Sequence, residues 1–447
     1  MKKNKQPNVL LKPLAPYQQF INIEALSGIV LFICSAIALI LANSSLSENF
    51  EHLWHTEIGF SIGTFEVHHS LHHWINDGLM AVFFFVIGLE IKRELLTGEL
   101  SSKEKVMLPV LAAAGGAVIP ALIFVAFNYG SDGVHGWGIP MATDIAFVLG
   151  IIALLGKRVP ASIKIFVLAF AIIDDLIAIL VIAIFYTAEI NWVSLFFGVG
   201  LLASAFVLKK LGFYNTVVFL ILGIISWFAF SASGIHPTIA GVIIAMSVPS
   251  LRKTSKDEYP DKVTSLLTEY NETGSETKFE KKQQQVIINE IEEVSASTES
   301  PLYKLEHILH PISSFVIMPV FALANAGIAV DATMFSSLTH PVSFGIIAAL
   351  FIGKPVGICL SIWVGIKLKI ATLPTGANWK HILAMASLGG MGFTLSLFIS
   401  VLAFKDAQLL SYAKIGVLAG SLISIIAGIT LFMLNNKSNA AAEHELH

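Results

Sequence analysis

The chain is poor in charge and in cysteine. Lys, Arg, Asp and Glu make up 13% of its 447 residues, whereas soluble domains carry roughly a quarter. So few charged side chains cannot cover the surface of a soluble protein that is 55% hydrophobic. The formal net charge of −3 provides no basic surface for nucleic acid. Cys34 and Cys359 lie far apart in apolar runs, which excludes a disulfide framework and a cysteine metal site.

Long apolar runs fill the chain instead. The mean hydropathy is +0.76, so lipid must be the solvent for much of the surface. Twelve runs predict an all-α membrane protein with twelve transmembrane helices. The expected spans are Ala25–Asn43, Asp77–Leu95, Val106–Phe127, Met141–Leu155, Ile163–Tyr186, Trp192–Leu208, Tyr214–Ser231, Ile235–Val248, Pro311–Val330, Val342–Ile366, Ile382–Phe404 and Leu409–Leu434.

The first apolar run has an alternative interpretation as a cleaved signal peptide. It follows a Lys-rich start and ends in Ala42-Asn43-Ser44, as signal peptides do. The run is long for a signal core and its charged lead is extended. We therefore expect a membrane span here.

Basic residues gather in alternate loops. If the N-terminus is cytoplasmic, the outer loops contain Lys405 and essentially no other basic residue. This positive-inside bias places both termini in the cytoplasm. We expect residues 1–434 to form one transmembrane domain, interrupted by a polar cytoplasmic loop insert at 251–300, with a cytoplasmic tail at 435–447.

Two loops differ from the others in pattern. In the first external loop, Ile58–Gly63 and Thr64–His68 alternate apolar and polar residues like a short hairpin. The insert is rich in Lys, Glu, Gln, Ser and Thr. That composition predicts a mostly disordered linker with a weak helix over Lys278–Val294.

Two spans are interrupted by glycine and proline. The fourth contains Gly138-Ile-Pro-Met-Ala-Thr-Asp144 and the eleventh contains Gly389-Gly-Met-Gly-Phe-Thr394. Transporters built from inverted repeats break a helix at corresponding positions of each half, and the half-helix ends face a midplane ion site. We therefore expect two broken, crossing helices, with spans three to five and ten to twelve as the inverted repeats.

Charged residues at mid-span carry the candidate chemistry. Asp174 and Asp175 fall in the middle of the fifth span, Lys354 in the tenth, and Asp144 at the break of the fourth. Ionisable groups at this depth are costly and mark ion or proton pathways. Two carboxylates about 5–6 Å apart repel by roughly 3 kcal/mol at an effective dielectric near 20. Such a pair favours holding either a proton or a hard cation, and this competition is sufficient for exchange transport.

The ligands of such a cation would be oxygens. Asp174, Asp175, the Thr143 hydroxyl and the unwound backbone supply them. Lys354 would neutralise Asp174 when the cation is absent, and Asp144 would offset the positive ends of the half-helices. The alternative is a structural ion pair that only holds helices together.

Several other titratable residues allow two interpretations each. The external histidines either bind a metal or are simply solvated; they are His68, His69, His72 and His73. Charged groups near inner span ends are either solvated ion pairs or regulatory; they are Glu90, Arg93, Glu94, Glu306, His307 and His310. His236 and Asp77 each stand at a helix start, where capping is sufficient to explain them.

At these residues the chain resembles the bacterial NhaA family of sodium/proton antiporters, which illustrates the inverted-repeat rule itself. The matching stretches run in order over nearly the whole chain. They are Trp74-Ile-Asn-Asp77, Gly88-Leu-Glu90-Ile-Lys-Arg93-Glu94, Ala142-Thr143-Asp144, Ala171-Ile-Ile-Asp174-Asp175, Leu305-Glu306-His307-Ile-Leu-His310, Ala324-Asn-Ala-Gly327, Ile352-Gly-Lys354-Pro and Gly389-Gly-Met-Gly-Phe-Thr394.

The resemblance implies an electrogenic exporter of sodium or lithium that uses inward proton flow, is activated at alkaline pH and serves sodium and pH homeostasis. It implies no enzyme activity and no cofactor. Asp175 would be the principal cation ligand, Asp174 the partner of Lys354, and Thr143 and Asp144 would lie in the crossed segments. The remaining implied roles are a pH response for Glu90, Arg93, Glu94, Glu306, His310 and His236, and an outward-side acid for Asp77.

The resemblance also implies a place and a partner. Family members lie in the bacterial inner membrane and dimerise through the first external loop, so a homodimer is expected beside the transported ions and the lipid. The insert at 251–300 is far longer than the usual connection and ends just before Glu306, so the chain departs from the family pattern beside the inner-mouth residues.

Three rivals come from other classes. A sodium-coupled solute symporter needs polar or aromatic groups for an organic substrate, whereas the mid-span set is acidic. An aspartyl protease needs its two Asp on facing helices, and a channel would be impeded by Lys354. The sequence leaves open the stoichiometry, the ion preference, the pH of activation, the role of the insert and the resting conformation.

Overall fold

The computed structural model describes residues 15–62, 65–187, 190–213, 215–250, 258–273, 277–298, 300–329 and 334–444. Within these ranges, eight helices are long and apolar enough to cross a membrane, or up to eleven if each bent helix pair is one span. The chain is therefore a multi-pass helical membrane protein, as predicted. Its contacts divide it into two compact units, one of Met1–Leu79, Glu99–Tyr186 and Ser313–His447, the other of Met80–Gly98 and Thr187–Ile312.

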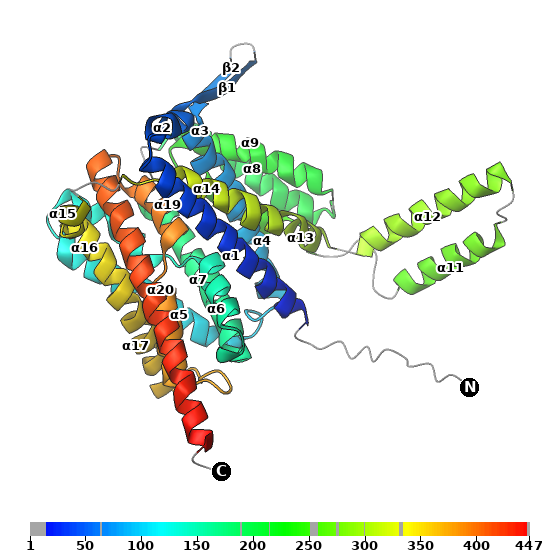
Figure 1. Ribbon diagram of the computed structural model, residues 1–447. Coiled ribbons are helices and arrows are strands. Elements are labelled where there is room, and N and C mark those ends of the chain that lie inside the picture. The colour runs from blue at the N-terminus through cyan, green and yellow to red at the C-terminus, as the bar shows by residue number, and fades with distance from the viewer. Residues whose placement is uncertain are drawn as a thin grey trace. The chain divides into compact units, whose positions relative to one another are not determined.

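The first unit contains the two interrupted spans. Within it α1 packs against α6, α5 against α17, and α20 against α16 and α18 (Figure 1). Its elements are α1 (Ala15–Ala42), α2 (Ser47–His55), β1 (Glu57–Ile62), β2 (Phe65–Ser70), α3 (Leu71–His73), η1 (Trp74–Leu79), α5 (Lys103–Asn128), η2 (Asp132–Met141), α6 (Ile145–Leu155), η3 (Gly156–Arg158), α7 (Ala161–Phe185), η4 (Ser313–Ile317), α14 (Met318–Asn325), α15 (Met334–Leu338), α16 (Pro341–Ala348), η5 (Ala349–Gly353), α17 (Lys354–Lys367), α18 (Trp379–Gly389), α19 (Phe393–Ala403) and α20 (Ala407–His444).

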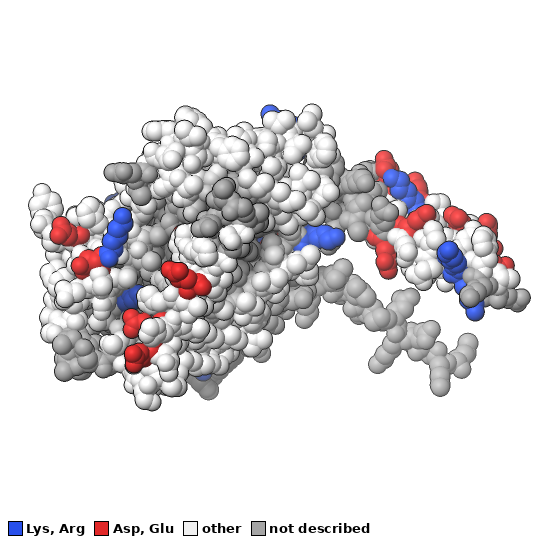
Figure 2. Space-filling view, turned by 90° about the horizontal axis from the view of Figure 1, so that it is seen from above, with Lys and Arg blue, Asp and Glu red and all other residues white. Residues whose placement is uncertain are grey.

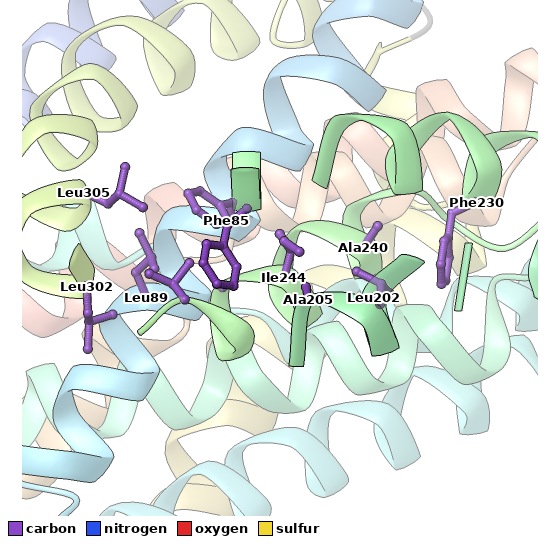
Figure 3. Packing of buried hydrophobic residues seen from close by; sticks show 12 residues of the cluster. Phe85, Leu89, Leu202, Ala205, Phe230, Ala240, Ile244, Leu302 and Leu305 are labelled. Carbon is purple, nitrogen blue, oxygen red and sulfur yellow. The ribbon is translucent and has the colours of Figure 1, made fainter. Parts of the chain in front are cut away.

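The second unit packs its helices around an apolar core. Its elements are α4 (Met80–Thr97), α8 (Trp192–Lys210), α9 (Thr216–Ser233), α10 (Thr238–Ser247), α11 (Glu258–Glu272), α12 (Lys278–Thr298) and α13 (Pro301–Ile312). Phe85, Ile244 and Leu305 belong to this core, which draws on α4, α8, α9, α10 and α13 (Figure 3). The close approach of α10 to α4 requires Gly241, because a Cβ there would lie 2.5 Å from the carbonyl oxygen of Ala81.

Each predicted span coincides with helical structure, but the eighth is short. In place of Ile235–Val248 the structure has α10, a helix of 10 residues, which is too short to cross a bilayer. Gly234, with φ 82°, ends α9 in the left-handed conformation, and Pro237 precedes α10. At the other end of the chain, α20 runs past residue 434 to His444.

Both predicted helix breaks are confirmed. The fourth span bends by 41° between η2 and α6, and the eleventh bends by 44° between α18 and α19. A third bend, of 114° between α1 and α2, was not predicted. Helical turns of the π type form η1, η4 and η5 and were not predicted either. Pro355 follows η5, and because it has no N–H for the carbonyl of Phe351, the regular helical ladder is interrupted there.

The predicted hairpin is confirmed. Strands β1 and β2 pair antiparallel, with Ile58 opposite His69 and Glu57 opposite Ser70. Residues 63 and 64, where the prediction ended the first strand and began the second, lie outside the described residues. The indole N–H of Trp74 donates to the carbonyl of Ile58 at 2.9 Å, so the hairpin is bonded to η1.

The prediction of a mostly disordered insert is wrong for its described residues. They form α11 and α12, which pack against each other, and the weak helix expected over Lys278–Val294 is confirmed as part of α12. Figure 2 shows charged residues of both signs over these two helices. Although the insert is mostly polar, α12 carries a narrow apolar stripe that includes Ile287, which is 2% exposed. The hydroxyl groups of Tyr259 and Ser295 are 3.1 Å apart across the pair.

Candidate functional site

The two helix breaks lie against each other in the first unit. The backbone N–H of Asp144 donates to the carbonyl of Met391 at 2.7 Å. The hydroxyl of Thr143 donates to the carbonyl of Gly389 at 2.8 Å. A Cβ on Gly390 would lie 2.2 Å from the carbonyl oxygen of Leu350, so only glycine permits this approach. Polar groups freed by each break are thus bonded across the crossing.

The carboxylate of Asp144 lies at the N-termini of both half-helices. One oxygen, Oδ2, accepts the N–H of Thr394 at 3.0 Å and also its hydroxyl. The other, Oδ1, accepts the N–H of Phe147 at 3.4 Å. Asp144 is 1% exposed. A negative charge at this place is favoured by the dipoles of α6 and α19.

An ion pair is buried beside this crossing. The ammonium nitrogen Nζ of Lys354 lies 2.8 Å from Oδ2 and 3.1 Å from Oδ1 of Asp174. The same ammonium donates to the carbonyl of Met141, the last residue before the break of the fourth span. Lys354 is fully buried and Asp174 is 2% exposed. The pair therefore joins α7, α17 and the end of η2.

Asp175 follows Asp174 on α7 and is 3% exposed. It lies within electrostatic range of Lys354, and Thr143 faces Asp174 with its hydroxyl and its backbone N–H. The five predicted ion-site residues are therefore brought together by the fold; they are Thr143, Asp144, Asp174, Asp175 and Lys354.

The donor atoms of this cluster are oxygens. Among the described residues, no group of three or more His, Cys, Asp or Glu side chains is arranged to hold a metal ion. Carboxylate, hydroxyl and carbonyl oxygens suit a hard cation, and the chemistry of the cluster fits one better than a soft transition metal.

A second charged cluster lies in the second unit. Nη1 of Arg93 is 2.7 Å from Oε1 of Glu306, and its Nη2 is 2.8 Å from Oε1 of Glu94. Glu90 is within electrostatic range of Arg93, and His310 of Glu306. The structure therefore joins α4 to α13 through the predicted pH-response residues.

Two predicted residues lie apart from these clusters. His236 precedes α10, where its Nδ1 is 2.8 Å from the hydroxyl of Thr238; this bond joins two side chains and caps no backbone N–H. Asp77 belongs to η1 of the first unit, and its Oδ2 lies 3.6 Å from Nδ1 of His73. The ring of His73 in turn lies 4.1 Å from that of His69, centroid to centroid.

Lys92 has a structural position that sequence reasoning missed. Its ammonium donates to the carbonyls of Ala245 at 3.4 Å, Met246 at 2.8 Å and Val248, all at the C-terminal end of α10. Lys209 donates to the carbonyl of Met246 at 3.3 Å. The sequence does show a lysine near the end of the apolar helix α4. It could not show which backbone carbonyls this lysine binds.

The comparison with known proteins agrees with this architecture. The sequence model of the family described as Na+/H+ antiporter 1 matches residues 18–432. A protein of Helicobacter pylori strain P12 named Na(+)/H(+) antiporter NhaA is 47% identical over 426 residues, which cover 94% of this chain and 96% of the relative.

Similar relatives occur outside that genus. Proteins of the same name from Sulfurimonas denitrificans and Rhodopirellula baltica are each 44% identical over 420 residues. These residues cover 93% and 94% of this chain and 95% and 94% of the relatives. The resemblance found in the sequence motifs is confirmed, and the chain belongs to the Na+/H+ antiporter 1 family.

Proposed function

We propose that the chain is a secondary active transporter that exports sodium, or lithium, in exchange for protons. The observation that carries the proposal is the buried Asp174–Lys354 ion pair beside Asp175, where the two broken spans cross. Charges at membrane depth are costly and are retained for ion or proton movement. The names of the relatives support the same exchange.

The exchange would follow from competition for one set of oxygens. Asp175 would be the principal cation ligand, with Asp174, the Thr143 hydroxyl and freed carbonyls completing the shell. A cation that binds Asp174 would take the place of the Lys354 ammonium, so the bond between Asp174 and Lys354 would weaken. Both a protonated Asp175 and the Lys354 ammonium can release a proton as the cation binds. More than one proton would then be exchanged for each ion, which makes the transport electrogenic.

Asp144 would reduce the positive potential that a cation meets at the crossing. Its negative charge sits at the N-termini of α6 and α19, where it would offset the positive half-helix ends. A cation entering the crossing would otherwise meet two positive dipole ends.

Activation at alkaline pH would be set by the Arg93 cluster. Arg93 contacts both Glu94 and Glu306, so a change of charge at one acid alters the bonds of α4 to α13. Glu90 and His310 would contribute through their charge, and His236 through the start of α10. Such control fits a role in sodium and pH homeostasis, and Asp77 would be the acid on the outward side.

The proposal makes the chain a transporter of the bacterial inner membrane and not an enzyme, with no resident cofactor. Basic residues concentrate in the loops assigned to the inside, which supports cytoplasmic termini and an external β1–β2 hairpin. An exposed two-stranded hairpin offers an edge for pairing with a second copy. We include a homodimer through this hairpin in the proposal.

The experiment uses everted membrane vesicles that hold a respiration-driven pH gradient reported by a fluorescent amine. Sodium or lithium is added at pH 7 and at pH 8.5 to wild type and to Asp175→Asn. We expect the gradient to collapse in wild type, more strongly at pH 8.5, and to persist in the variant. Wild type that is well inserted but leaves the gradient intact at both pH values would sink the proposal. A sodium-coupled solute symporter would then be the favoured function.

A further inference from the structure

A closed ring of hydrogen bonds joins three side chains of the first unit. Nε2 of His72 lies 3.2 Å from Oδ1 of Asn325. The amide Nδ2 of Asn325 donates to Oδ1 of Asn76 at 2.8 Å. The amide Nδ2 of Asn76 lies 3.3 Å from both ring nitrogens of His72. Asn325 is fully buried and Asn76 is 4% exposed, so these bonds replace water.

The ring has one consistent set of donors. Asn325 gives one amide hydrogen to Asn76, and its oxygen must then accept the Nε2–H of His72. Nδ1 of His72 keeps a lone pair, which accepts one amide hydrogen of Asn76. Within the ring each residue thus donates once and accepts once. Only the neutral imidazole with its hydrogen on Nε2 satisfies this arrangement.

The ring holds a π turn in place. Asn76 and Asp77 both belong to η1 (Trp74–Leu79), whereas Asn325 ends α14 and also donates to the carbonyl of Phe321 at 3.0 Å. The ring is therefore a side-chain connection between η1 and α14, which contact each other. Since Asp77 adjoins Asn76, the position of its carboxylate depends on the same turn.

Protonation of His72 breaks the ring. A hydrogen on Nδ1 would point at the amide hydrogens of Asn76, so two donors would face each other. The charged and titratable groups that face His72 are Lys414 of α20, His55 of α2 and His73 of α3. None of these three is an acid, so they offer the imidazolium no compensating charge.

We propose that His72 is a positioning residue whose neutral form fixes η1, and with it Asp77, against α14, and whose protonation from the external side releases this turn. The role rests on the proposed function, because Asp77 is the outward-side acid of the exchange. Acid outside the membrane would thereby slow the exchange at its outer entrance. Histidine is the side chain whose charge responds most readily to acidification, and the partial burial of His72 and its three neighbours mean that its full protonation requires a strongly acidic medium.

Hydrogen–deuterium exchange of the full chain in lipid nanodiscs tests the ring without measuring transport. Peptides over residues 71–79 and 318–326 are followed at pH 8 and pH 5.5, with rates corrected for the intrinsic effect of pH. In wild type we expect protection of these peptides to fall by at least about tenfold at pH 5.5, the size expected when a buried hydrogen bond is lost. In His72→Gln, which keeps a donor and an acceptor but does not titrate, we expect equal protection at both pH values.

A second variant reverses the logic of the ring. In Asn76→Asp, a carboxylate still accepts from Asn325 and also accepts the Nδ1–H of the imidazolium. We therefore expect protection to be greater at pH 5.5 than at pH 8. The matched control is His52→Gln, an exposed histidine of α2 that should behave as wild type. Protection in wild type that does not change with pH would overturn the proposal, as would an equal loss in His72→Gln.

Transport in proteoliposomes separates this proposal from the proposed function. With the internal pH fixed, lowering the external pH from 8 to 4 should slow sodium exchange in wild type severalfold more than in His72→Gln. An equal slowing in both would overturn the outer-entrance role of His72. If wild type showed no sodium exchange at all, the proposed function would fail, while the pH-dependent protection of η1 would still be decided by deuterium exchange.

Discussion

The ammonium of Lys354 faces both carboxylate oxygens of Asp174, at 2.8 and 3.1 Å, and both side chains are buried. Two charges buried this way stabilise each other but are costly to bring out of water. Removing one partner is therefore much worse than removing both. This asymmetry separates an ion pair from two independent polar residues.

We expect Lys354→Met to lower the free energy of unfolding by about 3–5 kcal/mol, because it leaves the Asp174 charge uncompensated. The double variant Lys354→Met with Asp174→Asn should recover a large part of that loss. Chemical denaturation of the purified protein in detergent measures both. Equal destabilisation of the single and double variants would contradict the pairing.

The same substitution should alter transport. If Lys354 neutralises Asp174 when the cation is absent, Lys354→Ala should change both the apparent sodium affinity and its pH dependence. Dose–response curves for sodium between pH 7 and pH 9 measure this. Unchanged affinity and pH dependence would show that the pair is only structural.

The bonds of Asp144 to α19 give a second stability prediction. Thr394→Val keeps the shape of the side chain but removes the hydroxyl that donates to Oδ2 of Asp144. We expect a loss of about 1.5–3 kcal/mol, typical of a hydrogen bond to a charged group. Thr394→Ser retains the hydroxyl and is the matched control. Similar stability of the Val and Ser variants would mean that the backbone N–H of Thr394 suffices.

Much of this fold could be predicted from the sequence, and the exceptions have a common cause. Apolar run length located the spans, and the glycines and prolines around Asp144 and Gly390 located the breaks, because local backbone chemistry decides both. The bonds of Lys92 to α10 could not be predicted, since every residue has a backbone carbonyl and the sequence does not mark which ones a lysine will reach. The α11–α12 pair was missed because two marginal helices form only when each buries the stripe of the other. The ring of His72, Asn76 and Asn325 joins residues about 250 positions apart and depends on tertiary contacts.

The Arg93 cluster predicts a change in the pH profile. In Glu306→Gln, Arg93 loses its 2.7 Å partner on α13, and its positive charge then acts more fully on Glu94 and Glu90, which favours their charged forms at lower pH. We expect half-maximal exchange at a pH lower by about half a unit or more, with the maximal rate retained. Glu99→Gln, which removes an acid paired with Lys105 near the surface, should leave the profile unchanged. A wild-type profile in Glu306→Gln would argue against a pH role for the cluster.

The insert can be removed if its ends meet, and they do. The backbone N–H of Leu302 donates to the carbonyl of Pro249 at 3.1 Å, so the two ends of the insert lie side by side within the second unit. Replacing residues 252–299 by a short Gly-Ser linker should therefore preserve the fold, since closing a short loop there costs little. We expect sodium exchange at pH 8.5 to remain within about twofold of wild type, because the ion-site residues belong to the first unit. A matched variant replaces residues 303–309 by the same Gly-Ser linker. We expect it to lose exchange, because it removes Leu305 from the core and Glu306 from the Arg93 cluster. Loss of exchange in the excised protein, with the helical content of the remaining chain intact, would instead assign the insert an essential part in activation.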